Sequence, residues 1–535
     1  MNKKKLVWWG TGNIASVLSE EYASEAPEFF IDSDPKKKHT KFMGRDVFLP
    51  EQIDDWENIK VIIVTDYDQQ IYEQNREKLQ RSEVYSYKEY FEKEIEISEL
   101  LKQRNEFIRA IECGEDENKI LFFGDVVSYD RGVCDYLNKM NKQTNNSMIL
   151  FSEANFITDA YIEKKIAFPY YQLPQMFKKN YVYRGDVAAY VSQEIIEYVN
   201  AKEHLHKAAE NLRLRHRDMA KNYEFLVCYY AEQCIGKLLE HFKPKVVYLW
   251  NKFYAFHLIL DSICRNKSID VRYMEFGVLP GTFAIESEGQ MGESFPAVRS
   301  EEFNQLPINK QDVLEAKRVV EYIQRKDLNR NIQNDESELG IVKSKLIEKR
   351  PIIFYAGQND FESSLQPYDA HTKKYHSPIY KSTMEGLIDL AELAKKNNWN
   401  LIFKPHPIML KYEDIRTVIP DNVIVVYQCN INRLIDLCDV CVTILSQVSY
   451  MSVIRKKATV MLGYHQLRGS GVIYQAFSKE KVWEMIDAAI KNGFMDEQEE
   501  YLYKHIARLN KYYLYNDLTD KEVEYGRKLN TYDIL

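Results

Sequence analysis

The chain has 535 residues, of which 45% are hydrophobic and 28% are charged, and its formal net charge at pH 7 is −8. This composition is typical of a globular protein, and the length predicts about three domains. The negative charge argues against a nucleic acid partner, because proteins that bind a polyanion usually carry excess positive charge. The eight scattered cysteines are expected to be buried thiols in a reducing cytoplasm. No apolar run approaches the roughly 20 residues that cross a bilayer.

Residues 1–95 predict a small Rossmann-like module. Apolar runs of strand length, separated by turns and helical patterns, indicate a parallel sheet. These runs are Leu6–Trp9, Phe29–Ile31 and Val61–Val64. Gly10, Gly12 and Ala15 follow the first run and Asp32 follows the second, as in the G-x-G-x-x-A fingerprint of dinucleotide sites. Only half of a dinucleotide-binding fold is present, so we favour a packing or regulatory role and keep Gly10, Gly12 and Asp32 as candidate nucleotide-binding residues.

Residues 96–117 predict a charged helical connector, and residues 118–310 predict a second α/β domain. The expected strands of this domain are Lys119–Phe123, Met148–Phe151, Val246–Trp250 and Val271–Met274. A helix expected over Lys202–Glu224 is rich in His, Lys and Arg. Such a helix can bind an anionic membrane or an acidic polymer, although a solvated helix face explains the same pattern.

A carboxylate ends the last of these strands, in the sequence Glu275-Phe-Gly277. Ligands of α/β domains bind at this end of a strand, and a partly desolvated carboxylate there can take the proton of an acceptor hydroxyl. Glu286 and Glu288 are rivals for this role, and a capping or ion-paired Glu275 is the structural alternative. We take Glu275 as the candidate general base.

Residues 311–344 predict a helical connection, residues 345–480 a third α/β domain, and residues 481–535 polar C-terminal helices that pack on the surface. The expected strands are Pro351–Tyr355, Leu401–Phe403, Val423–Val426, Val440–Ile444 and Thr459–Leu462. The carboxyl ends of parallel strands share one edge of a sheet, so the polar residues that follow them are expected to face one cleft.

Lys404-Pro-His-Pro407 follows the second of these strands. A lysine and a histidine held by two rigid prolines can grip a phosphate and stabilise the charge that develops on a leaving nucleotide. The structural alternative is a strand-end histidine beside a surface lysine. We take His406 as catalytic and Lys404 as donor-binding.

Five further polar residues are candidates for donor binding. Gln358 and Asp360 end the first strand, Ser446 and Ser449 follow the fourth, and Arg468 opens a glycine-containing loop after the last. Serine hydroxyls at a helix N-terminus form an anion site, and Arg468 could cover a bound donor. The alternatives are an ordinary turn for Gln358 and Asp360 and simple helix capping for the serines.

Together these motifs resemble bacterial capsule polysaccharide glycosyltransferases of the GT-B fold, and they are similar to the Kdo transferases of capsule assembly and to the bacterial polysialyltransferases. The resemblance covers residues 240–475 and, more weakly, 118–240. Its parts are Glu275–Gly277, Gly289–Ser294, Gln358–Asp360, Lys404–Pro407 and the region of Ser446. It implies two facing Rossmann-like domains and a CMP-linked acidic sugar as the donor.

The resemblance also implies roles for individual residues. Glu275 is then the general base, His406 binds the CMP phosphate, and Ser446 or Ser449 contacts the same phosphate. Two positions depart from the pattern. Phe276 stands where polysialyltransferases tend to have an acid, and Met451 stands near the place where many GT-B enzymes have a glutamate that holds the ribose hydroxyls. A covalent intermediate would need a nucleophile, for which Asp125 is a candidate on position alone.

We therefore predict an α/β protein with a GT-B-type pair of facing Rossmann-like domains and a small N-terminal Rossmann-like domain. It would be a metal-independent glycosyltransferase of the cytoplasm, or of the inner face of the membrane, with no cofactor beyond its nucleotide-sugar donor. The acceptor would be a capsular or other surface glycan, free or lipid-linked.

Three alternatives stay open. A CDP-glycerol or CDP-ribitol polymer phosphotransferase would share the fold and the His-Pro motif. A GT-B-like scaffold without activity would share the fold only. An oxidoreductase would use the glycine motif of the N-terminal module.

Overall fold

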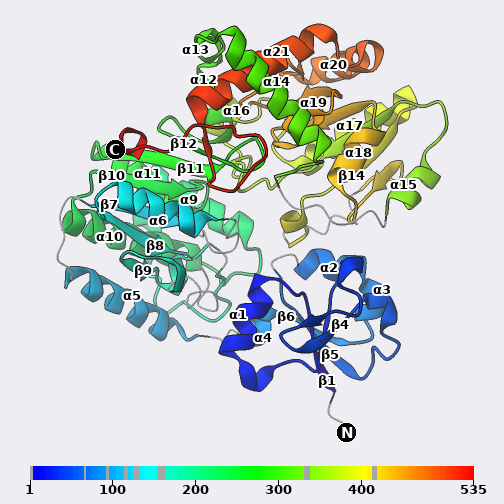
Figure 1. The fold of residues 1–535 in the computed structure, drawn as a ribbon. Helices are drawn as coiled ribbons and strands as arrows, with labels where there is room; N and C mark the ends of the chain where they lie inside the picture. The colour runs from blue at the N-terminus through cyan, green and yellow to red at the C-terminus, as the bar shows by residue number, and fades with distance from the viewer. Residues whose placement is uncertain are drawn as a thin grey trace.

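The computed structural model describes residues 4–65, 68–91, 95–113, 119–124, 132–153, 164–179, 181–330, 338–411 and 419–534. Three sheets organise these residues into an N-terminal, a middle and a third α/β unit (Figure 1). In each sheet the chain starts at a central strand, winds to one side and then returns to the other. All three units therefore have the strand order of a doubly wound, Rossmann-like fold.

The N-terminal sheet has the order β3-β4-β2-β1-β5-β6 and is parallel except for the β3–β4 pair. Its strands are β1 (Lys5–Trp9), β2 (Phe29–Ile31), β3 (Lys41–Phe42), β4 (Arg45–Phe48), β5 (Ile59–Ile63) and β6 (Glu83–Ser86). Its helices are α1 (Asn13–Glu21), α2 (Asp68–Gln74), α3 (Arg76–Leu79) and α4 (Tyr87–Phe91). Trp8 packs on one face of the sheet, and Val7 and Trp9 pack on the other. This burial on both faces explains the continuous apolar runs that predicted β1, β2 and β5.

The expected connector contains α5 (Ile97–Glu112). Its buried residues Ile97, Leu100, Phe107 and Ile111 have the spacing of one helix face. They belong to the same apolar cluster as the core of the middle unit. The helix is therefore a packed element of that unit.

The middle sheet has the order β19-β12-β11-β10-β7-β8-β9. Its strands are β7 (Ile120–Gly124), β8 (Met148–Ser152), β9 (Tyr170–Gln172), β10 (Val246–Trp250), β11 (Asp270–Phe276), β12 (Thr282–Glu286) and β19 (Leu514–Asn516). The strands from β9 to β11 are parallel, and β12 runs antiparallel to both of its neighbours. The helices are α6 (Val133–Gln143), α8 (Gln193–Asn200), α9 (Glu203–Arg215), α10 (Tyr223–Phe242), α11 (Ala255–Asn266) and α22 (Thr531–Ile534).

The third sheet is entirely parallel, with the order β15-β14-β13-β16-β17-β18. Its strands are β13 (Ile352–Ala356), β14 (Asn400–Lys404), β15 (Val423–Val425), β16 (Val440–Thr443), β17 (Ala458–Met461) and β18 (Tyr474–Gln475). Its surrounding helices are α12 (Phe295–Val298), α13 (Ser300–Gln305), α14 (Lys310–Arg325), α15 (Leu339–Lys345), α16 (Ala370–Tyr375), α17 (Thr383–Asn397), α18 (Ile431–Leu437) and α19 (Val448–Ile454). The strands predicted from residue 351 to residue 462 overlap β13 to β17, because each is a buried apolar run.

The C-terminal segment differs from the expected set of surface helices. Two helices are present, α20 (Lys479–Asn492) and α21 (Asp496–Arg508), but the chain then returns to the middle unit as β19. Leu514 and Tyr513 lie in the apolar core that β19 and the third unit share. A polar segment thus holds a short buried strand that joins two units.

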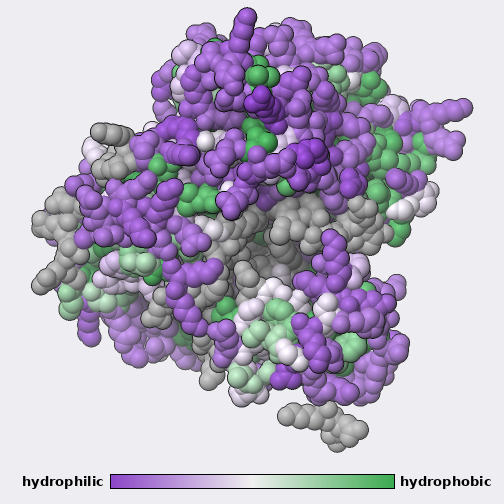
Figure 2. Space-filling model, viewed as in Figure 1, coloured by the Kyte–Doolittle hydropathy of each residue, from purple (hydrophilic) through white to green (hydrophobic). Residues whose placement is uncertain are grey.

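The face shown in Figure 2 is mostly hydrophilic, with apolar residues in small separate areas. Among the described helices, none combines the length and the apolar character needed to cross a membrane.

Candidate functional site

A cavity of about 840 Å³ lies where the carboxyl ends of the three parallel sheets meet. It is lined by residues at or just beyond the ends of β1, β2 and β5, of β8, β10 and β11, and of β13, β14 and β16. Ligands of doubly wound folds bind at these ends. The sequence predicts a cleft between the middle and third units, and the structure adds the N-terminal unit as a third wall.

Most of the residues singled out from the sequence come together here. Those that line the cavity are Glu275, Lys404, His406, Gln358, Ser446, Gly10, Gly12 and Asp32. Asp125 lies outside the described residues.

Asp360, Ser449 and Arg468 do not line the cavity. Asp360 is fully buried, and its carboxylate accepts hydrogen bonds from the N–H (2.9 Å) and the hydroxyl (2.5 Å) of Thr383 at the start of α17. Ser449 is also fully buried and donates its hydroxyl to the Ser446 carbonyl at 2.9 Å. The Arg468 guanidinium lies 4.0 Å from the ring centroid of Tyr464. The structure therefore places these three candidates outside the cavity, with the polar groups of Asp360 and Ser449 engaged within the fold.

His406 follows β14 and begins the turn into η7 (Pro407–Lys411). Its Nδ1 accepts the N–H of Ile408 at 3.3 Å, which leaves the ring proton on Nε2. Burial lowers the pKa of His406 to about 4, aided by the nearby cations Arg330 and Lys404 and opposed by Glu362. The imidazole is therefore neutral at pH 7 and offers a neutral N–H donor to the cavity.

The backbone around His406 is held close to β13. A Cβ added to Gly357 would lie 2.9 Å from the Lys404 carbonyl oxygen and 3.1 Å from the His406 nitrogen. The Lys404 ammonium lines the cavity and donates to the Tyr427 carbonyl at 2.7 Å. Glycine at position 357 thus permits the close approach that fixes the Lys404–His406 segment.

Glu275 lies at the carboxyl end of β11, across the cavity in the middle unit, and is 8% exposed. Burial raises the pKa of Glu275 to about 7, and the Arg330 cation opposes this rise. A carboxyl group with this pKa is poised to take a proton near neutral pH.

The structure separates Glu275 from its two rivals. Glu286 does not line the cavity. Its carboxylate accepts hydrogen bonds from the N–H groups of Gly289 (3.2 Å) and Phe295 (3.0 Å), so its role is structural. Glu288 pairs with Arg299 at 3.0 Å, and both side chains are exposed. Of the three carboxylates, only Glu275 lines the cavity.

Gln358 and Ser446 form part of the cavity wall that the third unit contributes. The Gln358 amide donates to the Ser363 hydroxyl at 3.1 Å and accepts the Leu445 N–H at 3.0 Å, so it ties the ends of β13 and β16 together. The Ser446 hydroxyl accepts the Val448 N–H at 3.3 Å near the start of α19. Gln358 therefore positions the cavity wall, and Ser446 keeps the capping contact considered in the sequence alternative.

Sequence reasoning missed an ion pair in the cavity wall that joins the middle and third units. The Lys179 ammonium lies 2.7 Å from the Glu362 carboxylate, and both side chains are largely buried. Burial alone would raise the pKa of Glu362, but Lys179 and then Arg215 lower it to about 2. Neither residue belongs to a motif, and no periodic pattern marks them.

A second missed group surrounds His257 in the middle unit. The Glu153 carboxylate lies 2.5 Å from His257 Nε2, and the Tyr254 hydroxyl lies 2.6 Å from the same nitrogen. Nδ1 of His257 contacts the Asn251 carbonyl at 2.6 Å. Glu153, Tyr254 and Asn251 line the cavity. The position of Glu153 directly after β8 is the sequence signal that could have found it.

The N-terminal unit is docked against the third unit. Gln70 donates to the Tyr427 carbonyl at 3.2 Å, which is the carbonyl that also accepts the Lys404 ammonium. Gln74 is hydrogen-bonded to Gln428. The glycine motif of this unit therefore faces the same cavity as His406.

The backbone of the glycine motif is closely packed at Gly10 and open at Gly12. Gly10 has a φ of +126°, and a Cβ there would lie 3.0 Å from the Val64 carbonyl oxygen. A Cβ on Gly12 would meet nothing within 4 Å. Asp32 is already engaged, with the Lys37 ammonium at 2.8 Å and the Thr11 hydroxyl bonded to the same oxygen.

One group of side chains in the described part of the chain has the residue types of a metal site: Glu293, His371 and His376. A single Glu293 oxygen lies 3.0 Å from His371 Nε2 and 2.9 Å from His376 Nε2. The other oxygen is ion-paired with Lys252. This ammonium already neutralises the carboxylate, so the group is explained as a polar contact between the middle and third units.

The basic helix predicted over Lys202–Glu224 is divided between α9 and α10. Several of its cations face the chain itself. Lys202 pairs with Glu232 at 2.9 Å and Lys207 with Asp369 at 2.7 Å. The side chain of Arg215 is buried. These residues do not form one solvated basic face.

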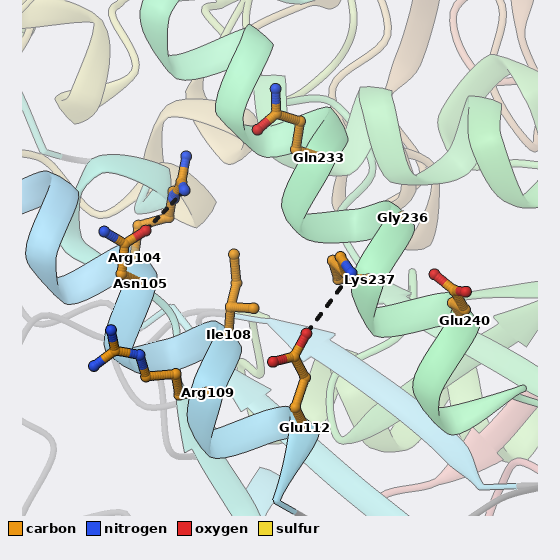
Figure 3. A pocket seen from close by; sticks show the side chains of 9 residues that line it. All are labelled: Arg104, Asn105, Ile108, Arg109, Glu112, Gln233, Gly236, Lys237 and Glu240. Carbon is orange, nitrogen blue, oxygen red and sulfur yellow. Dashed lines mark hydrogen bonds and ion pairs between the residues drawn. The ribbon is translucent and has the colours of Figure 1, made fainter.

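A second hollow lies between α5 and α10 (Figure 3). Arg109, Glu112, Lys237 and Glu240 carry mixed charges around it, and Lys237 lies 3.7 Å from Glu112. None of the residues singled out from the sequence lines it. The cavity at the strand ends is therefore the candidate active site.

No protein-family model and no curated protein sequence matches the chain. Similar solved structures include KpsC from Thermosulfurimonas dismutans, a β-Kdo 2,4 transferase, at 14% identity over 50% of this chain and 80% of that chain, with a TM-score of 0.36. They also include the Methanocaldococcus jannaschii UDP-GlcNAc 2-epimerase in complex with UDP-GlcNAc and UDP, at 12% identity over 74% and 99%, with a TM-score of 0.33. Anabaena HepE in complex with UDP and glucose matches at 11% identity over 73% and 94%, with a TM-score of 0.28.

Identities and scores at this level carry no argument about the chemistry of this chain. The chain's own strand orders carry the fold assignment. Two Rossmann-like units whose strand ends face one cavity form a GT-B-type arrangement, and a third such unit precedes them. The predicted fold class is confirmed.

Proposed function

We propose that this chain is a glycosyltransferase that moves a sugar from a nucleotide-sugar donor to a glycan acceptor. The observation that carries the proposal is the pairing of Glu275 and His406 across one cavity, each from a different Rossmann-like unit. One is a carboxyl group with a pKa near 7, and the other is a neutral imidazole. These are the states that a base and a leaving-group donor need at neutral pH.

The chemistry assigns one role to each side of the cavity. The acceptor hydroxyl oxygen forms a bond to the anomeric carbon of the donor sugar while Glu275 takes the hydroxyl proton. The bond between that carbon and the donor phosphate oxygen breaks, and the electron pair leaves with the nucleotide. The Nε2–H of His406 and the ammonium of Lys404 stabilise the charge that develops on the phosphate, with the Ser446 region at the start of α19 as a further anion contact.

The donor we propose is CMP-linked and carries an acidic sugar. The support is the set of motifs that resembles capsule Kdo transferases and polysialyltransferases. The competing nucleotide is UDP, which is bound in the Methanocaldococcus epimerase together with UDP-GlcNAc and in HepE together with glucose. Comparing CMP, CDP, UDP and GDP for thermal stabilisation separates them. Stabilisation by UDP without stabilisation by CMP would contradict the CMP assignment.

The acceptor we propose is a capsular or other surface polysaccharide, free or lipid-linked, handled in the cytoplasm at the inner face of the membrane. In the proposed scheme no metal is needed, because Lys404 and His406 supply the stabilisation that a cation would otherwise give. Activity that is unchanged in excess EDTA would support this, and activity restored only by added divalent cation would contradict it.

Release of free nucleotide from a panel of CMP-sugars tests the reaction. The wild-type chain should release CMP when an acceptor glycan is present, and His406→Ala should lower this release about 10²-fold or more. Glu288→Gln is the matched control, because Glu288 is an exposed, surface-paired carboxylate outside the cavity. An inactive wild-type chain with every donor would favour a non-catalytic scaffold, and activity with CDP-glycerol alone would favour a polymer phosphotransferase.

The oxidoreductase alternative is tested by titrating NADH against the tryptophan fluorescence, since Trp9 lines the cavity beside Gly10. We expect no response, because Lys37 and Thr11 already occupy the Asp32 carboxylate that would hold a ribose. Saturable quenching would contradict this expectation.

A further inference from the structure

Helix α15 packs on the third unit by one face and presents another face to solvent. Val342 is buried, and Leu346, four residues on, packs against the same apolar core. Ile341 is 55% exposed, and Lys345, four residues further along the chain, is exposed too. Residues four apart share a helix face, so the inward and outward faces are distinct. Figure 1 shows α15 at the right edge of the third unit, on the side away from the middle unit.

The apolar surface continues beyond the helix on a fixed backbone. Ile347 is 51% exposed, although its N–H donates to Oδ1 of Asn400 and its carbonyl accepts Nδ2 of Asn400, each at 2.9 Å. Trp483 of α20 is 44% exposed, and its indole N–H donates to Asn397, three residues before Asn400, at 3.1 Å. Large apolar side chains that gather at the surface mark a contact site, whereas single scattered ones do not.

The same edge is strongly basic. Residues 343–350 have a net charge of +3, in a chain whose net charge is −8. The charged residues of this segment are Lys343, Lys345, Glu348, Lys349 and Arg350. All three lysines are exposed, and none of the four cations is ion-paired within the described part of the chain. The cations of α9 are paired with carboxylates, whereas those of this edge are available to an anionic partner.

The combination of isoleucines and lysines selects the partner. An acidic polysaccharide would neutralise the cations but would leave Ile341 and Ile347 in water. A bilayer that contains anionic lipids satisfies both, because its headgroups attract lysines while its acyl boundary takes up apolar side chains. Tryptophan is enriched at the same boundary between membrane and water.

The basic edge starts at the wall of the candidate active site. Glu338 directly precedes α15, and its carboxylate accepts the N–H groups of Tyr427 (2.7 Å) and Gln428 (2.9 Å). Both of these residues line the cavity. The N-terminus of α15 is thus fixed to the cavity wall, and its exposed face leads away from that wall.

We propose that this edge docks the chain on a membrane that contains anionic lipids. The contact residues, which we call the α15 patch, are Ile341, Lys343, Lys345, Ile347 and Lys349. The lysines pair with lipid headgroups, and the two isoleucines enter the boundary of the acyl chains. Docking itself does not need the reaction. Its benefit rests on the proposed function, because docking brings a lipid-linked acceptor to the cavity beside α15.

Co-sedimentation of the full chain with phospholipid vesicles tests the proposal. The chain should bind vesicles of mixed phosphatidylcholine and phosphatidylglycerol more tightly than vesicles of phosphatidylcholine alone, and added salt should weaken this binding. Replacing Lys343, Lys345 and Lys349 together by Gln should weaken it about 10²-fold, because each cation near an anionic surface strengthens binding about fivefold. The matched control replaces three exposed lysines of the middle unit by Gln, namely Lys142, Lys221 and Lys267, and should bind as wild type.

A second variant separates a membrane from an acidic polymer. Ile341→Ser combined with Ile347→Ser keeps every charge and removes the apolar contact, so vesicle binding should weaken about tenfold or more. Both side chains are exposed, and CMP release with a soluble acceptor should stay at the wild-type level in this variant and in the lysine variant.

The outcomes distinguish this proposal from its alternatives. A wild-type chain that does not bind anionic vesicles, or an equal loss of binding in the two sets of lysine variants, would overturn it. Loss of binding in the α15 lysine variant with none in the isoleucine variant, together with competition by a soluble acidic polysaccharide, would overturn it in favour of a polymer site. Vesicle binding without CMP release from any donor would support docking and overturn the proposed function, and CMP release without vesicle binding would overturn docking alone.

Discussion

Removal of the Glu275 carboxylate is the most direct test of the catalytic assignment. We expect Glu275→Gln to lower kcat/KM by about 10²–10⁴, the usual contribution of a general base. Glutamine has the same shape and cannot take a proton, so nucleotide binding should be retained. Glu288→Gln, with its exposed and ion-paired side chain, is the control and should behave as wild type.

The pH profile of the wild-type chain gives this prediction a second readout. With a pKa of about 7, Glu275 is about one tenth ionised at pH 6 and about nine tenths ionised at pH 8. A base must be ionised to act, so kcat/KM should rise through pH 7 and level off above pH 8. His406 has a pKa of about 4 and stays neutral across this range, so it adds no falling limb.

Arg330 gives the profile an internal control. Its cation lowers the pKa of Glu275, so Arg330→Met should move the rising limb to higher pH and leave the rate at high pH little changed. The measurement is initial-rate CMP release from pH 5.5 to pH 9 at low donor concentration. A wild-type profile that is flat from pH 6 to pH 8, or a Glu275→Gln variant with near-normal activity, would refute the assignment.

Three further predictions concern the leaving-group side and the framework. His406→Gln should retain more CMP release than His406→Ala, which should lose about 10²-fold or more, because an amide still offers a neutral donor; equal losses would contradict the donor role. Gly357→Ala should lower the free energy of unfolding by about 1–3 kcal/mol, because the added Cβ would lie 2.9 Å from a carbonyl oxygen. Gly340→Ala is the control, because the space around Gly340 is open, and it should not lower this free energy. Chemical denaturation of the two variants measures the difference. Lys179→Met should cost about 2–3 kcal/mol at pH 7 and less at pH 3, because the folded-state pKa of Glu362 is about 2 and the stability from this pair is lost as pH falls toward that value. An equal cost at both pH values would contradict that ion pair.

Part of the site follows from local sequence alone. His406 and Lys404 follow a run that is buried on both faces of a parallel sheet, and such a run is recognisable without any partner. Glu275 follows the same rule at the end of β11. The polar residues that end such strands reach the ligand edge of the sheet wherever the units lie.

Side-chain direction and long-range contact do not follow from local sequence. Ser446 lines the cavity and Ser449 is turned into the fold, although they are three residues apart. Glu275 and Glu286 lie on the same face of the adjacent antiparallel strands β11 and β12, but Glu286 is level with Tyr273, further from the carboxyl end of β11, and only Glu275 lines the cavity. Which side chains reach the cavity therefore depends on strand pairing and packing, which a local pattern does not fix.

The sequence by itself determined the three Rossmann-like units and the strand ends at which their polar residues lie. Short apolar runs predict the strands, and the turn residues that follow these runs predict where the strands end. Only the tertiary structure decided that the N-terminal unit closes the same cavity and that β19 returns to the middle sheet. Both depend on contacts between segments hundreds of residues apart, and no local pattern encodes which surfaces meet.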